Sequence, residues 1–154
     1  DKIALDFGCG PGRNIAKFKD RFKRIDGTDI GAKNLENAKL WLETNGVKSY
    51  NLYKTNGDKL APISSDQYDI VFSTICLQHI GVYEVRYSLL EEFFRVLKTG
   101  GSICIQMGFG GSPHYYAGYK ANNYDKGGDV SITDLNELID DLTKIGFKNF
   151  RQDF

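Results

Sequence analysis

The 154-residue sequence lacks an excess of either charge, because 20 basic residues balance 20 acidic ones. A neutral total disfavours a protein that lives on bare nucleic acid, which needs a basic surface. The sequence also lacks any apolar run near the ~20 residues of a membrane-spanning helix. The remaining composition is typical of one globular domain with a single core.

Cysteine is scarce. Cys9, Cys76 and Cys104 are odd in number, lie far apart, and each falls in or beside an apolar run. This pattern argues against a disulfide framework and against a zinc site, and we expect no metal. It indicates reduced, mostly buried thiols in a cytoplasmic protein.

Short apolar runs alternate with amphipathic stretches along the chain. The apolar runs predict strands over residues 3–7, 24–29, 49–55, 69–75, 102–107 and 147–154. Apolar residues at helical spacing predict helices over 13–22, 32–44, 82–97 and 133–145, the last with Thr133 as its N-cap. This alternation predicts an α/β fold, a doubly wound and mostly parallel sheet with helices on both faces. Ligands of such sheets bind at the carboxyl ends of the strands.

Residues 108–130 break the alternation with six glycines and four tyrosines. A connection of this length without a clear period is typical of a functional loop, and we predict a substrate loop or lid. Its aromatic side chains either wall a substrate such as a cationic amine or pack the loop onto the sheet. The candidate substrate-side residues are His114, Tyr115, Tyr116 and Tyr119.

The stretch DFGCGPGRN, residues 6–14, overlaps the end of the first predicted strand and continues into a turn. Gly8 permits a sharp turn, Gly10 permits close approach of a ligand, and Gly12 permits close packing of the next helix. We expect free N–H groups in this turn, suited to an anionic or strongly accepting ligand, whereas the alternative is a plain strand-to-helix turn. The spacing is G-x-G-x-G, not the G-x-G-x-x-G of dinucleotide sites, and Asp6 precedes it. A carboxylate there repels a pyrophosphate and attracts an ammonium, which favours a nucleoside with a cationic amino-acid tail over NAD.

Acidic residues also follow the second and third predicted strands. Asp29 can accept both hydroxyls of a ribose, and Ile30 can lie against a purine. Asp58, beside Gly57, can accept from an exocyclic amine. One acid at a strand end is most often a helix cap or a solvated charge. Three in order after this glycine turn indicate a nucleoside site.

These motifs together resemble the class I S-adenosylmethionine-dependent methyltransferases. The matching stretches are LDFGCGPGRN, GTDIG, NGD, YDIVFSTICLQHI, LLEEFFRVLKTGGSICI and LIDDLTKIGFKNF. The resemblance implies a Rossmann-like fold, S-adenosyl-L-methionine as cofactor and S-adenosyl-L-homocysteine as product. It places Asp6 near the methionine amino group and Ser73 on the methionine side. The full set that it assigns to the cofactor is Asp6, Gly8, Cys9, Gly10, Gly12, Asp29, Ile30, Gly57, Asp58, Ser73 and Gln78, the last with solvent exposure as its alternative.

Two departures from the family pattern stand out. The family has a helix before the first strand and an antiparallel seventh strand between the fifth and sixth, and neither is present in this sequence. We therefore expect residues 1–154 to be a single methyltransferase domain that is truncated at both ends.

Methyl transfer from a sulfonium is an in-line displacement for which the protein supplies mainly position, worth roughly 7–11 kcal/mol. A base is needed only where the acceptor keeps its proton. His79, in CLQHI after the fourth predicted strand, is the candidate catalytic base. Its alternative role is to orient a loop or cap the next helix.

The absence of two known motifs limits the class of methyl acceptor. The nucleic-acid amino-methyltransferases carry an acid or amide, two prolines and an aromatic residue after the fourth strand, whereas residues 73–76 read STIC. Cys76 also lacks the preceding proline of the cytosine-C5 enzymes. We therefore predict transfer to O or N of a small-molecule acceptor, ahead of a protein or RNA acceptor. The competing hypotheses are a cofactor-binding module that needs a partner and an NAD-linked oxidoreductase.

Overall fold

The computed structural model describes residues 1–110, 117–123 and 129–153. A five-stranded sheet has the order β3-β2-β1-β4-β5, and every neighbouring pair is parallel. Its strands are β1 (Ile3–Phe7), β2 (Arg24–Asp29), β3 (Leu52–Lys54), β4 (Tyr68–Thr74) and β5 (Leu97–Gln106). The helices are α1 (Arg13–Phe18), α2 (Ala32–Thr44), α3 (Tyr83–Val96) and α4 (Leu135–Ile145), with a 3-10 helix η1 (Leu77–His79). Within these ranges no helix is long and apolar enough to cross a membrane.

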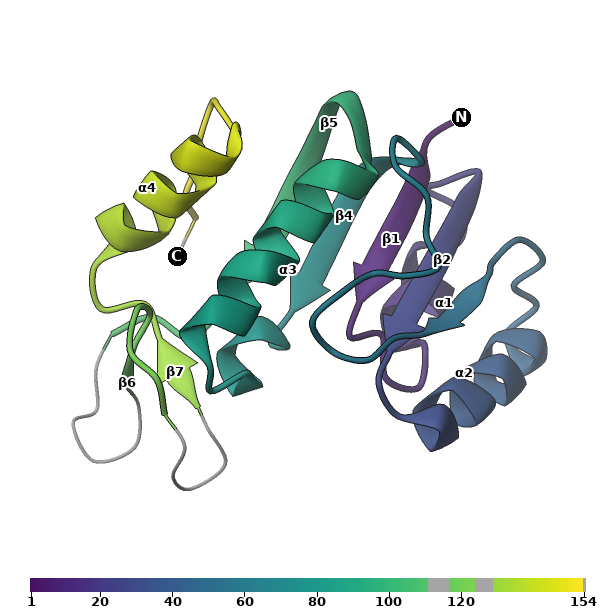
Figure 1. The fold of residues 1–154 in the computed structure, drawn as a ribbon. Coiled ribbons are helices and arrows are strands. Elements are labelled where there is room, and N and C mark those ends of the chain that lie inside the picture. The colour runs from purple at the N-terminus through teal and green to yellow at the C-terminus, as the bar shows by residue number, and fades with distance from the viewer. Residues whose placement is uncertain (111–116, 124–128, 154) are drawn as a thin grey trace.

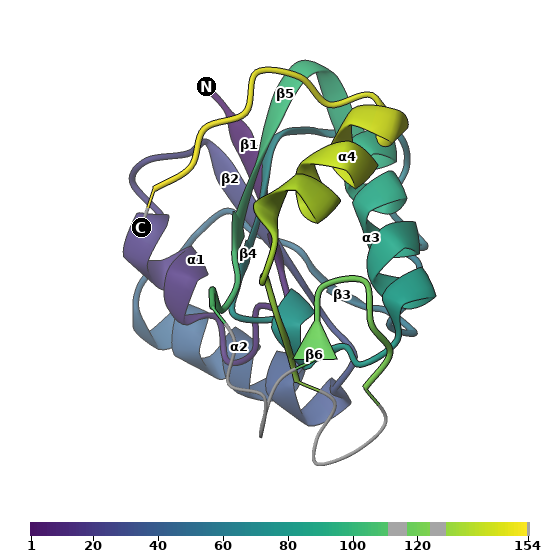
Figure 2. The same cartoon turned by 90° about the vertical axis from the view of Figure 1, so that its left-hand side faces the viewer.

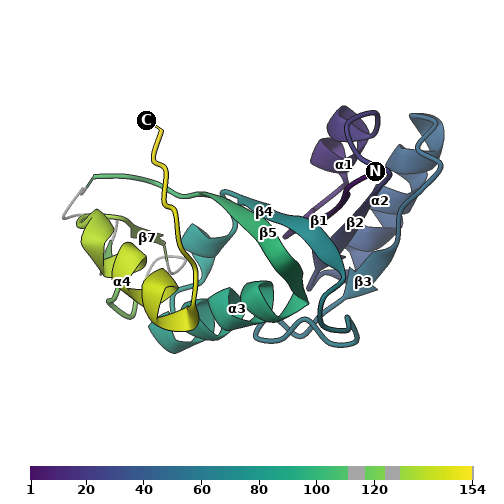
Figure 3. The ribbon, with the colours of Figure 1, turned by 90° about the horizontal axis from the view of Figure 1, so that it is seen from above.

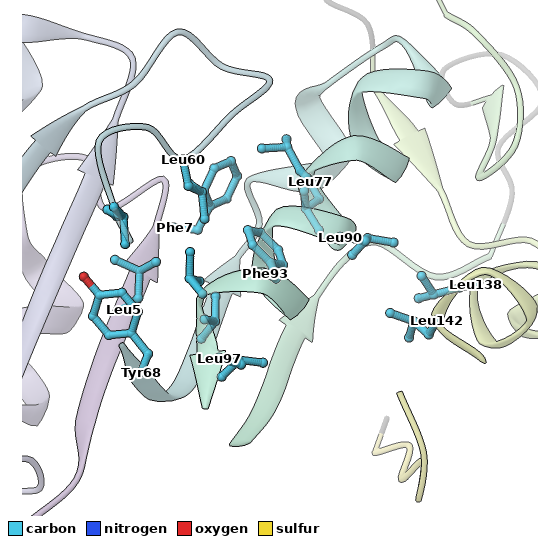
Figure 4. Packing of buried hydrophobic residues seen from close by; sticks show 14 of the residues in the cluster. Leu5, Phe7, Leu60, Tyr68, Leu77, Leu90, Phe93, Leu97, Leu138 and Leu142 are labelled. Carbon is cyan, nitrogen blue, oxygen red and sulfur yellow. The ribbon is translucent and has the colours of Figure 1, made fainter. Parts of the chain in front are cut away.

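The helices cover both faces of the sheet, which confirms the predicted doubly wound fold (Figures 1 and 3). On one face Ile15 and Leu42, from α1 and α2, pack with Ile25 of β2. On the other face Phe93 of α3 lies 5.0 Å from Phe7 of β1, ring centroid to ring centroid. Figure 4 shows this second core between the sheet and α3. Full burial of each such side chain contributes about 1.5–3 kcal/mol.

The strand order changes direction between β1 and β4, since β1 pairs with both β2 and β4. Asp6 near the carboxyl end of β1 therefore stands between Gly27 of β2 and Phe72 of β4. The carboxyl ends of these three strands lie along one edge of the sheet, the lower edge in Figure 1. This is the switch point at which open α/β sheets bind their ligands.

The predicted strand over residues 147–154 is wrong, because residues 147–153 form no strand. Asn149 has a φ of +62°, a left-handed conformation that interrupts an extended chain. After α4 the chain runs past the outer edge of β5 (Figures 2 and 3), and β5 remains the edge strand of the sheet.

Other predicted boundaries shift by a few residues. The first helix ends at Phe18 instead of residue 22, and β3 keeps only three of the seven residues predicted for it. The N-cap of α4 is Asp134, whose side chain accepts from the amide of Asn136 at 2.9 Å, so the prediction of Thr133 is wrong.

Part of the segment predicted as a loop is regular. β6 (Ala117–Gly118) and β7 (Val130–Ser131) form a small parallel sheet, and Phe109 bridges to Ile132 beside it. The described ends of residues 108–130 are thereby held beside each other and beside Ile132.

Candidate cofactor and active site

The glycine loop between β1 and α1 needs glycine for its backbone. Gly8, Gly10 and Gly12 have φ values of +72°, +50° and +80°. A Cβ at Gly8 would lie 2.3 Å from Sγ of Cys76, and a Cβ at Gly12 would lie 3.2 Å from Leu42. A Cβ at Gly10 would meet nothing within 4 Å, so the space beside this residue is open.

We expected free backbone N–H groups in this loop, but three of them are hydrogen-bonded within the chain. The amide of Cys9 donates to the carbonyl of Thr28 at 2.9 Å, and that of Gly12 donates to the carbonyl of Cys9 at 2.9 Å. The amide of Gly10 donates to Oδ2 of Asp29 at 3.0 Å. These three amides hold the loop together. The prediction that they are free to bind an anionic or strongly accepting ligand is therefore wrong.

Asp6 is a buried acid without full compensation. Its residue is 1% exposed, and Oδ2 has no hydrogen-bond partner in the described chain. Burial raises the pKa of Asp6 to about 7, the nearby charge of Asp29 adds to this, and a hydrogen bond from Asn14 opposes it. A buried carboxyl with an unpartnered oxygen at the switch point is a candidate ligand contact, and a cation is the group that would compensate its charge.

Asp29 ends β2 and is held by three donors. Oδ1 accepts from the amide of Gly31 at 2.7 Å and from Nδ2 of Asn34 at 3.0 Å, while Oδ2 accepts from Gly10. The contact with Asn34 has no counterpart among the sequence predictions. The carboxylate is partly exposed, and its oxygens keep lone pairs for a further donor such as a hydroxyl.

Ile30 and Gly57 come together next to Asp29. The Ile30 side chain is 65% exposed, and a Cβ at Gly57 would lie 3.4 Å from its Cγ2. Asp58 is exposed on the loop after β3. An exposed isoleucine beside a bare backbone offers an apolar surface for a flat ring.

The carboxyl end of β4 carries an unusual backbone. Ile75, a β-branched residue, has a φ of +53° and is 47% exposed. Such outliers cluster at functional sites. Ser73 is buried, with an Oγ that lacks a hydrogen-bond partner within the described chain. Burial raises the pKa of Cys76 to about 11, so its thiol stays protonated and is a packing group, not a nucleophile.

Gln78 and His79 of η1 both contact the chain that follows β5. Oε1 of Gln78 accepts from the amide of Gly108 at 2.8 Å, a contact that the sequence did not predict, and its cofactor contact stays a prediction. Nδ1 of His79 lies 2.7 Å from Oδ1 of Asp129. Sequence reasoning missed Asp129, because 50 residues separate it from His79 and no local pattern marks it.

The predicted substrate loop is only partly described. His114, Tyr115 and Tyr116 lie outside the described residues. Tyr119 is 1% exposed and meets Tyr83 edge-on, with ring centroids 5.9 Å apart. The two roles considered for this ring were to wall a substrate and to pack the loop. The structure shows packing, so the ring offers no open surface to a substrate in this conformation.

A protein-family model described as "Methyltransferase domain" matches residues 5–105, which is most of the chain and includes the glycine loop, Asp29 and His79. The chain belongs to this methyltransferase family. Its relatives include phosphoethanolamine N-methyltransferase 2 of Caenorhabditis elegans, 28% identical over 94% of this chain and 32% of the relative. Ribosomal RNA small subunit methyltransferase C of Hahella chejuensis is 35% identical over 66% of this chain and 30% of the relative.

Solved structures agree on the methyltransferase fold. An S-adenosylmethionine-dependent methyltransferase from Aquifex aeolicus superposes with a TM-score of 0.72 at 18% identity, covering 97% of this chain and 74% of that one. At this identity the likeness shows the fold alone. The chain spans about a third of the length of the curated methyltransferases described above.

Proposed function

We propose that this chain is the cofactor-binding and catalytic core of a methyltransferase that moves a methyl group from S-adenosyl-L-methionine to O or N of a small-molecule acceptor. The observation that carries the proposal is the pair of acids at the switch point. Asp6 is buried with one carboxyl oxygen unpartnered, and Asp29 is held against the glycine loop. Two carboxylates at this edge of the sheet would repel a pyrophosphate, whereas they would attract a nucleoside that carries an ammonium group.

The residues present fit this cofactor. The carboxylate of Asp6 would pair with the ammonium of the methionine portion, beside the open backbone at Gly10. Asp29 would accept the ribose hydroxyls, and the exposed face of Ile30 would lie against the adenine, with Gly57 and Asp58 at its edge. When bound, the cofactor supplies an activated methyl group on a sulfonium.

The chain's own residues supply position and, where needed, a base. The short turn from Cys76 to His79 contacts the glycine loop at one end and Asp129 at the other, so an acceptor would approach beside His79. The imidazole of His79 is 52% exposed and would take a proton from an acceptor hydroxyl or ammonium. The partly buried thiol of Cys76 packs against the turn at Gly8.

The acceptor class rests on charge and on motifs. The chain has no excess of basic residues with which to bind the phosphates of a nucleic acid. Residues 73–76, STIC, also differ from the pattern that follows β4 in nucleic-acid amino-methyltransferases. A protein or RNA acceptor is the second candidate, favoured by the similarity to an enzyme named for ribosomal RNA. A cofactor-binding module without activity of its own is the third.

Methyl-labelled S-adenosylmethionine, incubated with this chain and separate panels of small hydroxyl compounds, small amines, total RNA and protein extract, tests the proposal. We expect label in one of the small-molecule panels, lost on Asp29→Ala. Label in RNA or protein alone would move the function to the second candidate. Binding of S-adenosylhomocysteine without label in any panel would favour the third.

A further inference from the structure

The contact between His79 and Asp129 joins the end of η1 to the start of β7. Nδ1 of the imidazole and Oδ1 of the carboxylate are 2.7 Å apart, and the two side chains are 52% and 30% exposed. An ionised carboxylate only accepts hydrogen bonds, so Nδ1 must carry the hydrogen. In a neutral ring the lone pair then sits on Nε2, the nitrogen that a general base uses.

The dyad is tied to the rim of the candidate cofactor site. The amide of His79 donates to the carbonyl of Cys76 at 3.0 Å, closing the turn of η1. Cys76 in turn lies against the glycine loop, where its Sγ would be 2.3 Å from a Cβ at Gly8. One short turn therefore connects the loop that would hold the methionine portion to the imidazole.

Other contacts already fasten the segment that carries Asp129. The amide of Asn123 donates to the carbonyl of Gly81 at 2.8 Å, and its Nδ2 donates to the backbone carbonyl of Asp129 at 2.7 Å. The guanidinium of Arg86 donates to the carbonyls of Ile80, Tyr119 and Ala121, which joins the same two stretches of chain. The carboxylate of Asp129 is therefore not required to hold its segment in place, and its bond to His79 acts on the ring.

We propose that Asp129 is a positioning residue that fixes the tautomer and orientation of His79, and that this dyad suits the site to acceptors that lose a proton on methylation. Among the O and N acceptors of the proposed function, these are hydroxyl and ammonium groups. In the step, the acceptor atom forms a bond to the methyl carbon, the methyl–sulfur bond breaks, and its electron pair remains on sulfur. Nε2 of His79 takes the acceptor's proton, and the carboxylate of Asp129 stabilises the resulting imidazolium. The acceptor class rests on the proposed function, whereas the tautomer does not.

Nitrogen NMR of the imidazoles tests the tautomer without any acceptor. The chain has two histidines, so His114→Gln leaves the ring of His79 alone in the spectrum. We expect a hydrogen on Nδ1 and a bare Nε2 in this background, and a shift toward the Nε2–H form on adding Asp129→Asn. Asp140→Asn, the same change on the exposed face of α4, should leave the spectrum unaltered. A ring with its hydrogen on Nε2, or one indifferent to Asp129→Asn, overturns the proposal.

Methyl transfer tests the chemical role. We expect Asp129→Asn to lower kcat by about 10²-fold or more, with the Kd for S-adenosylhomocysteine within about twofold of the parent protein, because Asp129 touches no residue assigned to the cofactor. Asp129→Glu should recover part of the loss. Equal kcat in Asp129→Asn and the parent overturns the positioning role. Transfer confined to tertiary amines or thioethers, which carry no proton to lose, overturns the acceptor class. The absence of transfer to any hydroxyl or amine while S-adenosylhomocysteine binds also overturns it. Failure of S-adenosylhomocysteine to bind rejects the proposed cofactor instead, and the NMR result still decides the tautomer.

Discussion

Asp29 and Gly10 are joined by a hydrogen bond of 3.0 Å from the glycine amide to Oδ2 of the carboxylate. The bond links the end of β2 to the middle of the loop after β1, so the group that would meet a ribose also shapes the turn that would meet the methionine portion. The same carboxylate accepts from Gly31 at the start of α2. A single side chain would thus position two parts of the proposed ligand.

Asp6 should make the free protein less stable as the pH rises. Its pKa moves from 3.8 to about 7 on folding, so between about pH 4 and pH 7 the folded state retains a proton that the unfolded state releases. The contribution of protonated Asp6 to the free energy of unfolding is therefore complete below about pH 4. It falls as the pH rises to 7, by about 4 kcal/mol at most. Asp6→Asn should remove this slope and be the more stable protein at pH 8. Urea unfolding from pH 4.5 to 8 measures it, with Asp20→Asn as the exposed control. Parallel curves for Asp6→Asn and the parent would contradict the account.

Binding of S-adenosylhomocysteine should release a proton near pH 6. The ligand's ammonium pairs with ionised Asp6, whose pKa of about 7 in the free protein leaves it mostly protonated at that pH. We expect about one proton released per ligand at pH 6 and almost none at pH 8, with up to tenfold weaker binding per unit below pH 7. Calorimetry in two buffers of different ionisation enthalpy measures the proton. Asp6→Asn should bind weakly with no proton release. A parent protein that binds equally at pH 6 and pH 8 would place the ammonium elsewhere.

Gly8→Ala should destabilise the fold by two separable effects. The positive φ costs roughly 1 kcal/mol, and the overlap of the new Cβ with Cys76 costs roughly 1–3 kcal/mol more. Gly100→Ala is the matched control, since Gly100 has a φ of +79° but nothing within 4 Å of its Cβ position. Adding Cys76→Gly to Gly8→Ala should recover the second effect only. A double-mutant cycle by urea unfolding tests this, and strictly additive effects would show that the two residues do not touch.

Arg86→Met should loosen the chain around η1. Arg86 is 1% exposed and donates to three backbone carbonyls, and burial lowers its pKa. Leaving these carbonyls without a donor should cost roughly 2–4 kcal/mol. Hydrogen exchange should show faster exchange at the amides of Ala121 and Asn123, whereas Arg13→Met on exposed α1 should change neither. Unaltered protection in Arg86→Met would mean that this arginine does not hold the segment.

The sequence predicted best what depends on local pattern. β1, β2 and α2 have their predicted bounds, because a short apolar run or a helical stripe ends at a glycine or at an Asn-Gly pair. The strand predicted at 147–154 failed because a strand needs a partner, and Asn149 turns the chain where an extended run was expected. A hydrophobic pattern does not report the partner or the turn.

The positions of candidate site residues were predictable where these residues lie at strand ends. Asp6 and Asp29 lie at the same edge of the sheet, as predicted, because parallel strands bring their carboxyl ends together. The loop donors were misjudged, since nothing local shows that Thr28 and Asp29 accept from Cys9 and Gly10. Asp129 was missed because only the fold brings it to His79.

The cofactor assignment is tested most directly by calorimetric titration of this chain with S-adenosylhomocysteine, beside Asp29→Ala and an NADH titration. Asp29 bonds the glycine loop and faces the proposed ribose position, so one substitution addresses both parts of the site. We predict micromolar binding of S-adenosylhomocysteine, at least tenfold weaker binding by a folded Asp29→Ala, and none of NADH; hydrogen bonds to charged groups of roughly 1.5–3 kcal/mol give a loss of that size. Binding of NADH in its place, or no binding of S-adenosylhomocysteine by the folded chain, would contradict the assignment.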